Sequence, residues 1–182
     1  MSRLAALVLA VVVSGCASSS PGSGISGRDQ TVRVSDGSTT YRIQPTDAMA
    51  VANMPYAAPE VWNIMASVFD SLGIAVGTLD PQKLVIGNTA LKIHGRLGAV
   101  PLSRYIDCGQ TQGFPSAETY DVHLSVLTQV TPGKEPNTSA IATMVEAAAR
   151  PMQFKGDYAL CQTKGELEAR IPRIALARLT KK

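Results

Sequence analysis

The stretch APEVWNIMASVFDSLG, residues 58–73, carries the clearest local pattern of this 182-residue sequence and decides the expected fold. Pro59 stands where a helix tolerates proline best, in its first turn, and Gly73 stands where a helix commonly ends. Apolar residues recur at helical spacing along one side: Val61, Met65, Val68 and Leu72, widened by Trp62, Ile64 and Phe69. Because the opposite side is polar, the pattern predicts a helix with one face buried on a sheet.

Trp62 on this helix has two open interpretations. A large aromatic beside a helix–sheet cavity can serve as a platform for a ligand, and it can equally be a core residue. Its place on the same stripe as Met65 and Phe69 favours the core. We therefore expect Trp62 to be buried against the sheet.

The segments on both sides of this helix are typical of strands separated by turns. Upstream, TVRVSDGSTTYRIQP (31–45) alternates around an Asp-Gly pair and predicts a hairpin, and AMAVANMPY (48–56) suits a short strand. Downstream, GIAVGTLDPQKLVIGN (73–88) predicts two strands joined by an Asp-Pro turn. A further strand is expected around residues 91–93, followed by a loop.

Two segments, ETYDVHLSVLTQV (118–130) and TSAIATMVEAAAR (138–150), predict an antiparallel hairpin with one buried face. On the first strand the face expected to be buried consists of Tyr120, Val122, Leu124, Val126 and Val130. On the second strand it consists of Ile141, Thr143, Val145 and Ala147. The other face of the first strand holds Asp121, His123, Ser125 and Gln129. We interpret these polar residues as a solvated sheet face rather than as a ligand site.

The C-terminal stretch CQTKGELEARIPRIALARL, residues 161–179, predicts a second amphipathic helix. Thr163 and Glu166 have the spacing of a capping box, and Pro172 is expected to kink or shorten the helix. Two helices and several antiparallel strands predict the α+β class: a two-layer domain with two helices packed on one face of an antiparallel sheet. This single domain is expected to span residues 31–182.

The N-terminus, MSRLAALVLAVVVSGC, predicts a lipoprotein signal peptide over residues 1–15. Arg3 supplies the positive charge, and the apolar run 4–13 is shorter than the roughly 20 residues of a membrane span. The small residues that precede Cys16 resemble the lipobox of bacterial lipoproteins. In that family the cysteine is lipidated on its sulfur, the preceding peptide is removed and the new N-terminus is acylated, which implies these steps for Cys16.

Residues 16–30 are rich in Ser and Gly, a composition that predicts a flexible tether spanning ~20 Å. Two or more acyl chains hold a protein stably on a membrane, whereas one chain anchors it marginally. The residue after Cys16 is Ala17 rather than Asp, which resembles the sorting signal of outer-membrane lipoproteins in Gram-negative bacteria. The expected location is the outer membrane, with a lipid-anchored domain that faces the periplasm.

Cys108 and Cys161 are the two cysteines that remain beside Cys16. In an exported domain two thiols commonly pair, so a disulfide is expected; two separate buried thiols are the alternative. In the chain-entropy model, closing this loop removes ~4 kcal/mol of unfolded-state entropy. No metal site is expected, because two cysteines and two distant histidines lack the spacing of a ligand set.

Charge and composition argue against a nucleic-acid partner. The formal net charge is +3, one unit of which belongs to Arg3 in the signal peptide, and no Lys/Arg block is interleaved with aromatics. The basic residues that cluster are at the C-terminus: Arg170, Arg173, Arg178, Lys181 and Lys182. We interpret this cluster as a solvated helix face, with a functional contact as the alternative.

No motif predicts catalysis. His94, Ser103 and Asp107 are the residue types of a hydrolase triad, but the Gly-x-Ser-x-Gly elbow is missing. The glycine-rich stretches lack the strand-to-helix context of a phosphate loop. We therefore expect a non-enzymatic protein without a cofactor.

Residues 59–87, PEVWNIMASVFDSLGIAVGTLDPQKLVIG, resemble the helix-grip domains of the lipoprotein C subunit of the outer-membrane β-barrel assembly machinery. In those domains an aromatic residue early in the helix, a Leu-Gly pair at the end of the helix and an Asp in the following hairpin recur. Here Trp62, Leu72-Gly73 and Asp80 occupy these positions. The stretch SRYIDCG and the later C…KGELEARI are similar instead to uncharacterised bacterial lipoproteins. These resemblances imply a domain that docks onto an envelope protein partner. The alternative is a lipoprotein that binds a small ligand or lipid between the long helix and the sheet.

Overall fold

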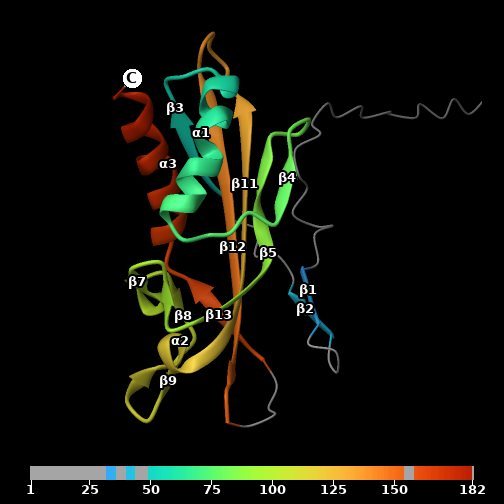
Figure 1. Cartoon of the computed structure of the whole chain (residues 1–182), viewed down its shortest axis with the longest axis vertical. Coiled ribbons are helices and arrows are strands. Elements are labelled where there is room, and N and C mark those ends of the chain that lie inside the picture. The colour runs from blue at the N-terminus through green and yellow to red at the C-terminus, as the bar shows by residue number, and fades with distance from the viewer. Residues whose placement is uncertain (1–31, 36–39, 44–48, 154–157, 182) are drawn as a thin grey trace, which may run out of the picture.

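The computed structural model describes residues 32–35, 40–43, 49–153 and 158–181. Within these ranges a seven-stranded antiparallel sheet carries helices on one face, so the predicted α+β class is confirmed (Figure 1). The strands run in the order β4-β5-β11-β12-β13-β8, and β3 also pairs with β12. They are β3 (Ala50–Met54), β4 (Thr78–Asp80), β5 (Val85–His94), β8 (Ile106–Asp107), β11 (Tyr120–Pro132), β12 (Ser139–Pro151) and β13 (Ala159–Thr163).

Smaller elements complete the described chain. β1 (Val32–Ser35) pairs with β2 (Thr40–Ile43), which confirms strands on both sides of the predicted turn. The other short elements are β6 (Arg96–Leu97), β7 (Val100–Pro101), the 3-10 helix η1 (Leu102–Arg104), β9 (Gln110–Thr111), β10 (Phe114–Pro115) and α2 (Ser116–Thr119). The predicted signal peptide, Cys16 and the tether lie outside the described residues. Among the described helices, none has the length and apolarity needed to cross a membrane.

Helix α1 (Ala58–Ser71) forms where the sequence predicted it. It ends in a Schellman motif: the Gly73 nitrogen donates to the Asp70 carbonyl at 2.9 Å, and the Ile74 nitrogen donates to the Phe69 carbonyl at 3.0 Å. Gly73 has a φ of 74°, and a Cβ there would lie 2.9 Å from the Gly98 Cα, so a larger residue would not fit. The predicted apolar stripe is buried: Val61, Ile64, Met65, Val68, Phe69 and Leu72.

Trp62 differs from the prediction. It is half-buried and packs against the edge of the core instead of lying within it. The preceding residue, Val61, is 0% exposed and points into the core. Because successive residues of a helix point in different directions, Trp62 lies at the margin of the buried stripe.

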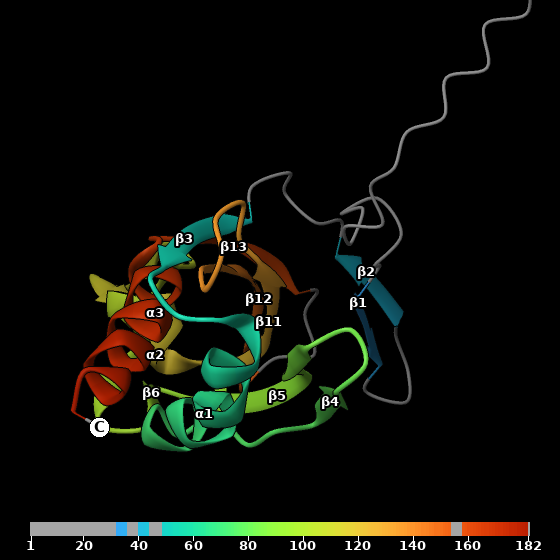
Figure 2. The same cartoon turned by 90° about the horizontal axis from the view of Figure 1, so that it is seen from above.

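Strands β11 and β12 form the centre of the sheet and pair along their whole length, with Tyr120 opposite Pro151 and Pro132 opposite Ser139. α1 and α3 lie side by side on one face of this sheet (Figure 2). On that face the predicted apolar residues of both strands are buried except Tyr120, which is partly buried, and the Oγ1 atoms of Thr128 and Thr143 lie 3.1 Å apart. The predicted hairpin with a buried face is confirmed.

The opposite face of β11 was expected to be solvated, and this prediction is wrong. His123 is 6% exposed and Ser125 is 1% exposed, while Asp121 and Gln129 are half-buried. A second apolar cluster lies on this face, formed by Val85, Leu127 and Met144. Strict alternation shows which side chains share a face, but it does not show whether that second face is covered.

The strand expected around residues 91–93 is not separate. It is the second half of β5, which runs from Val85 to His94 beside β11. A register shift opposite the Leu124–Val126 step divides the two halves. This irregularity breaks the alternation of β5, so the pattern indicated two strands where the chain forms one.

Helix α3 (Glu166–Leu179) begins later than predicted. Residues 161–163 belong to β13, which pairs with β12 and β8, so strand pairing replaces the expected first helical turn. The capping box is absent: Thr163 Oγ1 donates to the Glu168 carboxylate, and Gly165 is the N-cap with a φ of 74°. The helix continues through Pro172 to Leu179, so the proline does not shorten it.

Candidate functional site

The residue types of a hydrolase triad do not come together. His94 Nδ1 lies 3.1 Å from the Tyr120 carbonyl oxygen. Ser103 Oγ donates to the Glu118 carboxylate, and Asp107 Oδ1 accepts a hydrogen bond from the backbone two residues later at 2.8 Å. Each side chain is engaged with a different partner, so His94, Ser103 and Asp107 do not form a triad.

The core beneath α1 is closed. Met65, Val68 and Phe69 are each 0% exposed. Trp62 lines none of the four pockets compared on the described surface. A ligand platform at Trp62 therefore has no support among these pockets.

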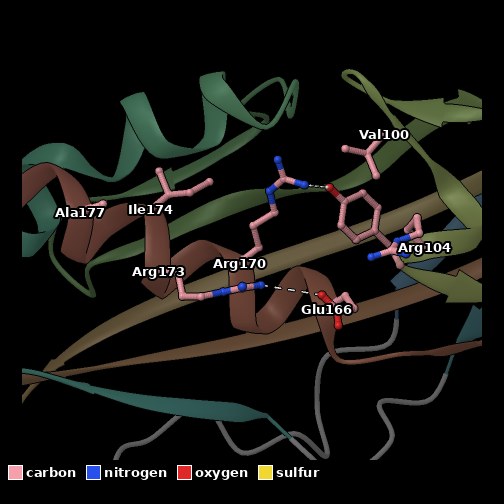
Figure 3. Close-up of a pocket in the computed structure, with 8 residues that line it drawn as sticks. Val100, Arg104, Glu166, Arg170, Arg173, Ile174 and Ala177 are labelled. Carbon is pink, nitrogen blue, oxygen red and sulfur yellow. Dashed lines mark hydrogen bonds and ion pairs between the residues drawn. The ribbon is translucent and has the colours of Figure 1, made fainter.

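A basic pocket of about 420 Å³ lies between α3 and the segment that contains β7 and η1 (Figure 3). Its apolar lining comes from Val100 and from α3, and its polar lining includes three guanidinium groups. The lining residues are Val100, Arg104, Tyr105, Glu166, Arg170, Arg173, Ile174 and Ala177.

Two of the three guanidiniums are held in place by neighbours. Arg170 Nη1 donates to the Tyr105 hydroxyl at 2.8 Å, and Tyr105 itself is 3% exposed. Arg173 Nη2 lies 3.7 Å from Glu166 Oε2, and its Nε donates to a carbonyl one turn back along α3 (Figure 3). A charged group fixed by a buried hydroxyl loses less side-chain entropy when it binds an anion.

Arg104 is the third guanidinium, and it is exposed. Within the described part of the chain it has no hydrogen-bond or ion-pair partner. Arg104 lines the pocket on the other side of Tyr105 from the Arg170 guanidinium (Figure 3).

The two walls of the pocket are tied together by bonds between segments that are distant in the sequence. The Lys164 nitrogen donates to the Tyr105 carbonyl at 2.8 Å, and Lys164 Nζ donates to the Ser103 carbonyl at 2.7 Å. The Sγ atoms of Cys108 and Cys161 lie 2.01 Å apart, at disulfide distance, as the sequence predicted for this pair. These links hold η1 against the start of α3.

The charges that line this pocket suit an anionic group. Three guanidiniums and a single carboxylate leave an excess of positive charge, and guanidiniums bind carboxylates and phosphates in a bidentate manner. In the described part of the chain no group of three or more His, Cys, Asp or Glu side chains could hold a metal ion.

The sequence predicted the C-terminal basic cluster, and the structure divides it. Arg170 and Arg173 reach the pocket, whereas Arg178 donates to Ser67 Oγ on α1. Lys182 lies outside the described residues. Arg104 was missed; the available signal was the predicted cysteine pair, because joining residues 108 and 161 brings its segment near the start of α3.

A buried polar group on the opposite sheet face was also missed. Ser125 and Glu146 face each other across β11 and β12, and Ser125 Oγ and both Glu146 carboxylate oxygens lack hydrogen-bond partners among the described residues. Burial raises the pKa of Glu146 from 4.5 to about 7. His123 Nε2 lies 2.6 Å from the Tyr158 hydroxyl oxygen nearby. Because Ser125 and Glu146 are buried, we do not assign this pair to binding, and their unpartnered oxygens are expected to cost stability.

Comparison with known proteins adds no relative: no protein-family model matches the chain, and no curated protein matches it. The basic pocket beside α3 is therefore the candidate functional site on geometry alone.

Proposed function

We propose that this protein is a non-enzymatic lipoprotein of the bacterial outer membrane whose periplasmic domain docks onto an acidic surface of an envelope protein partner. The observation that carries the proposal is the basic pocket, where Arg104, Arg170 and Arg173 surround one open site. Arginine and tyrosine are enriched at protein interfaces, and complementary charge steers partners together.

Membrane attachment is proposed from the sequence around Cys16. Its positive n-region, short apolar run and small residues before the cysteine resemble the lipoprotein pattern. Replacing the thiol in Cys16→Ser removes the atom that would carry the lipid, so the variant should remain soluble or unprocessed. Fractionation of cells that express the full-length chain measures this. A processed Cys16→Ser protein that still fractionates with membranes would contradict the anchor.

The docking surface can be tested with a photo-crosslinking amino acid at Ala177. This residue is exposed and lines the basic pocket, so the probe should capture the partner without disturbing the core. The expected result is a protein adduct in native membranes. Arg104→Glu reverses a charge at the pocket and should abolish the adduct.

Two controls separate a specific interface from general charge. Lys134→Glu makes a similar charge reversal at an exposed residue outside the basic pocket and should leave the adduct intact. The same probe at Leu79, 58% exposed on β4, should give no adduct. An Ala177 adduct that is insensitive to Arg104→Glu would refute the docking surface. A lipid adduct without protein would favour the ligand-binding alternative.

A further inference from the structure

A second surface, on the other flank of α3, adjoins the basic pocket, and Arg173 lines both. A groove of about 410 Å³ runs between β3 and α3, and we call it the edge groove. All five residues of β3 line it, together with one side of α3 that includes Glu168, Pro172 and Leu176. β3 and α3 lie next to each other when the molecule is seen from above (Figure 2).

β3 is an edge strand with a free side. In the described part of the chain it pairs with β12 and with no other strand. Apart from that ladder, its backbone groups have no hydrogen-bond partner among the described residues. An unpaired row of N–H and C=O groups is a template on which another strand can pair.

The sequence of β3 does nothing to block such pairing. Proteins usually protect an exposed edge with a charge, a proline or a very short strand. β3 reads AVANM, with neither a charge nor a proline in its five residues. The edge strand β4 is better protected: it has only three residues and ends at the charged Asp80, whereas a proline directly follows both strands, Pro81 after β4 and Pro55 after β3.

Exposed apolar side chains mark the same place. Val51 on β3 is 65% exposed, and Leu176 on α3 is 39% exposed. An added strand would pair beside Val51 and could cover Leu176, which lines the groove. Removing apolar surface from water at this edge favours association.

Two charged side chains line the groove, Glu168 and Arg173; Arg173 lies 3.7 Å from Glu166, so Glu168 is the one without an ion-pair partner among the described residues. Glu168 is 6% exposed, and one oxygen of its carboxylate accepts a hydrogen bond from Thr163. The other oxygen, Oε2, is buried and has no hydrogen-bond partner in the described part of the chain. A buried acceptor without a donor is unfavourable, so a donor supplied by a bound segment would be gained at this point.

We propose that an extended segment of a partner protein adds to β3 as a further strand in the edge groove, and that a Lys or Arg of this segment donates to Glu168. Apolar residues at alternate positions of the segment cover Val51 and Leu176. The backbone of β3 supplies affinity, and Glu168 supplies selectivity for a basic residue. The proposed strand pairing uses β3, which does not line the basic pocket.

The test uses a phage-displayed library of ten-residue random peptides, selected on the full mature chain. The selected peptides should share alternating apolar residues and one Lys or Arg. When a selected peptide binds, backbone amide hydrogen exchange should slow at Ala50–Met54. Slow exchange in this strand reports new pairing directly, because the outward amides of a free edge exchange with water.

Variants measure each contribution by the fluorescence anisotropy of a labelled selected peptide. Glu168→Gln keeps the shape of the side chain but removes its charge, and Val51→Lys places a charge on the exposed edge; each should weaken binding at least tenfold. Arg104→Glu should bind the peptide as wild type does while it loses the Ala177 adduct, so the two surfaces are tested separately.

Three results would overturn the proposal: no selected peptide, unchanged exchange in β3 when a peptide is bound, or equal binding by the Glu168→Gln variant. The thermal midpoints of both edge variants provide the folding control. If both fall far below wild type, Leu176→Ser replaces them as the variant whose weaker binding is required.

Discussion

Helices α1 and α3 have the same length of 14 residues and pack against each other on one face of the sheet, yet they present different surfaces. The inner side of α1 is sealed into the core, and its outer side is polar. α3 also buries an apolar stripe, formed by Leu167, Ile171, Ala175 and Leu179, but both of its flanks line open pockets. The difference indicates that the inner side of α1 serves stability, whereas α3 also carries side chains that line open pockets.

The largest loss of stability is expected on the inner side of α1. Phe69 is 0% exposed, and Phe69→Ala leaves a cavity that should lower the free energy of unfolding by about 3–5 kcal/mol. Asn63→Ala, on the exposed side of the same helix, should change it by about 0.5 kcal/mol or less. Urea denaturation measures both variants. Similar values for the two would contradict the division of α1 into a sealed side and a solvated side.

Loss of the cysteine pair should act mainly near the start of α3. The double variant Cys108→Ser and Cys161→Ser opens a link across 53 residues, and removing such a bridge should cost about 2–4 kcal/mol. Because this link holds η1 near α3, the Ala177 adduct should weaken even where the domain remains folded. Alkylation of the exported wild-type protein without reductant is the control, and two freely alkylated thiols would refute the bridge.

A pH-dependent effect is expected from Glu146, on the sheet face away from both helices. Its folded pKa is about 7 against 4.5 for the ordinary carboxyl, so the folded state retains the proton over a range where the unfolded state releases it. The contribution to stability is complete below pH 4.5 and is lost as pH rises to about 7. Glu146→Gln cannot ionise, so its stability relative to wild type should increase across this window.

Denaturation below pH 4.5, within the window and above pH 7 checks the sign of the Glu146 effect. A constant difference between Glu146→Gln and wild type would show that this carboxyl does not titrate as its burial implies. The Ala177 adduct should be unaffected by the substitution, because Glu146 lines neither flank of α3.

Trp62→Ala should have a smaller effect than Phe69→Ala. Trp62 is half-buried at the margin of the core, so truncation should lower the free energy of unfolding by about 1–2 kcal/mol. Thermal unfolding of the two variants gives the comparison. A midpoint within a degree or two of wild type would exclude even the partial packing, and a loss equal to that of Phe69→Ala would place Trp62 fully in the core.

The smallest change in stability is expected at Leu176, on the exposed flank of α3. Because this side chain is 39% exposed, Leu176→Ser should alter the free energy of unfolding by about 0.5–1 kcal/mol. The affinity of the Leu176→Ser variant for a selected peptide should nevertheless fall clearly. A large loss of stability without a change in binding would place Leu176 with the core residues and remove the contrast between the helices.

Several features could be predicted because they depend on residues close together in the chain. The stripe and the Pro59 and Gly73 signals of α1 specify a helix within one short segment, and the alternation of β11 and β12 specifies a hairpin. The cysteine pair was predictable because two cysteines remain beside Cys16 and because the compartment expected for the domain is oxidising. These features give the fold class and a sealed helix, but no site.

The site depends on segments that are distant in the sequence. Residues 161–163 carry a helix-capping pattern, yet pairing with β12 and β8 makes them a strand. Arg104 and Arg170 line the same pocket because η1 and α3 are tied together. The Ser125 face is buried although its alternation resembles that of an exposed strand. Local patterns record preferences between near neighbours, whereas burial, strand partners and pocket walls follow from packing the whole chain, where many such preferences compete and the lowest total free energy prevails.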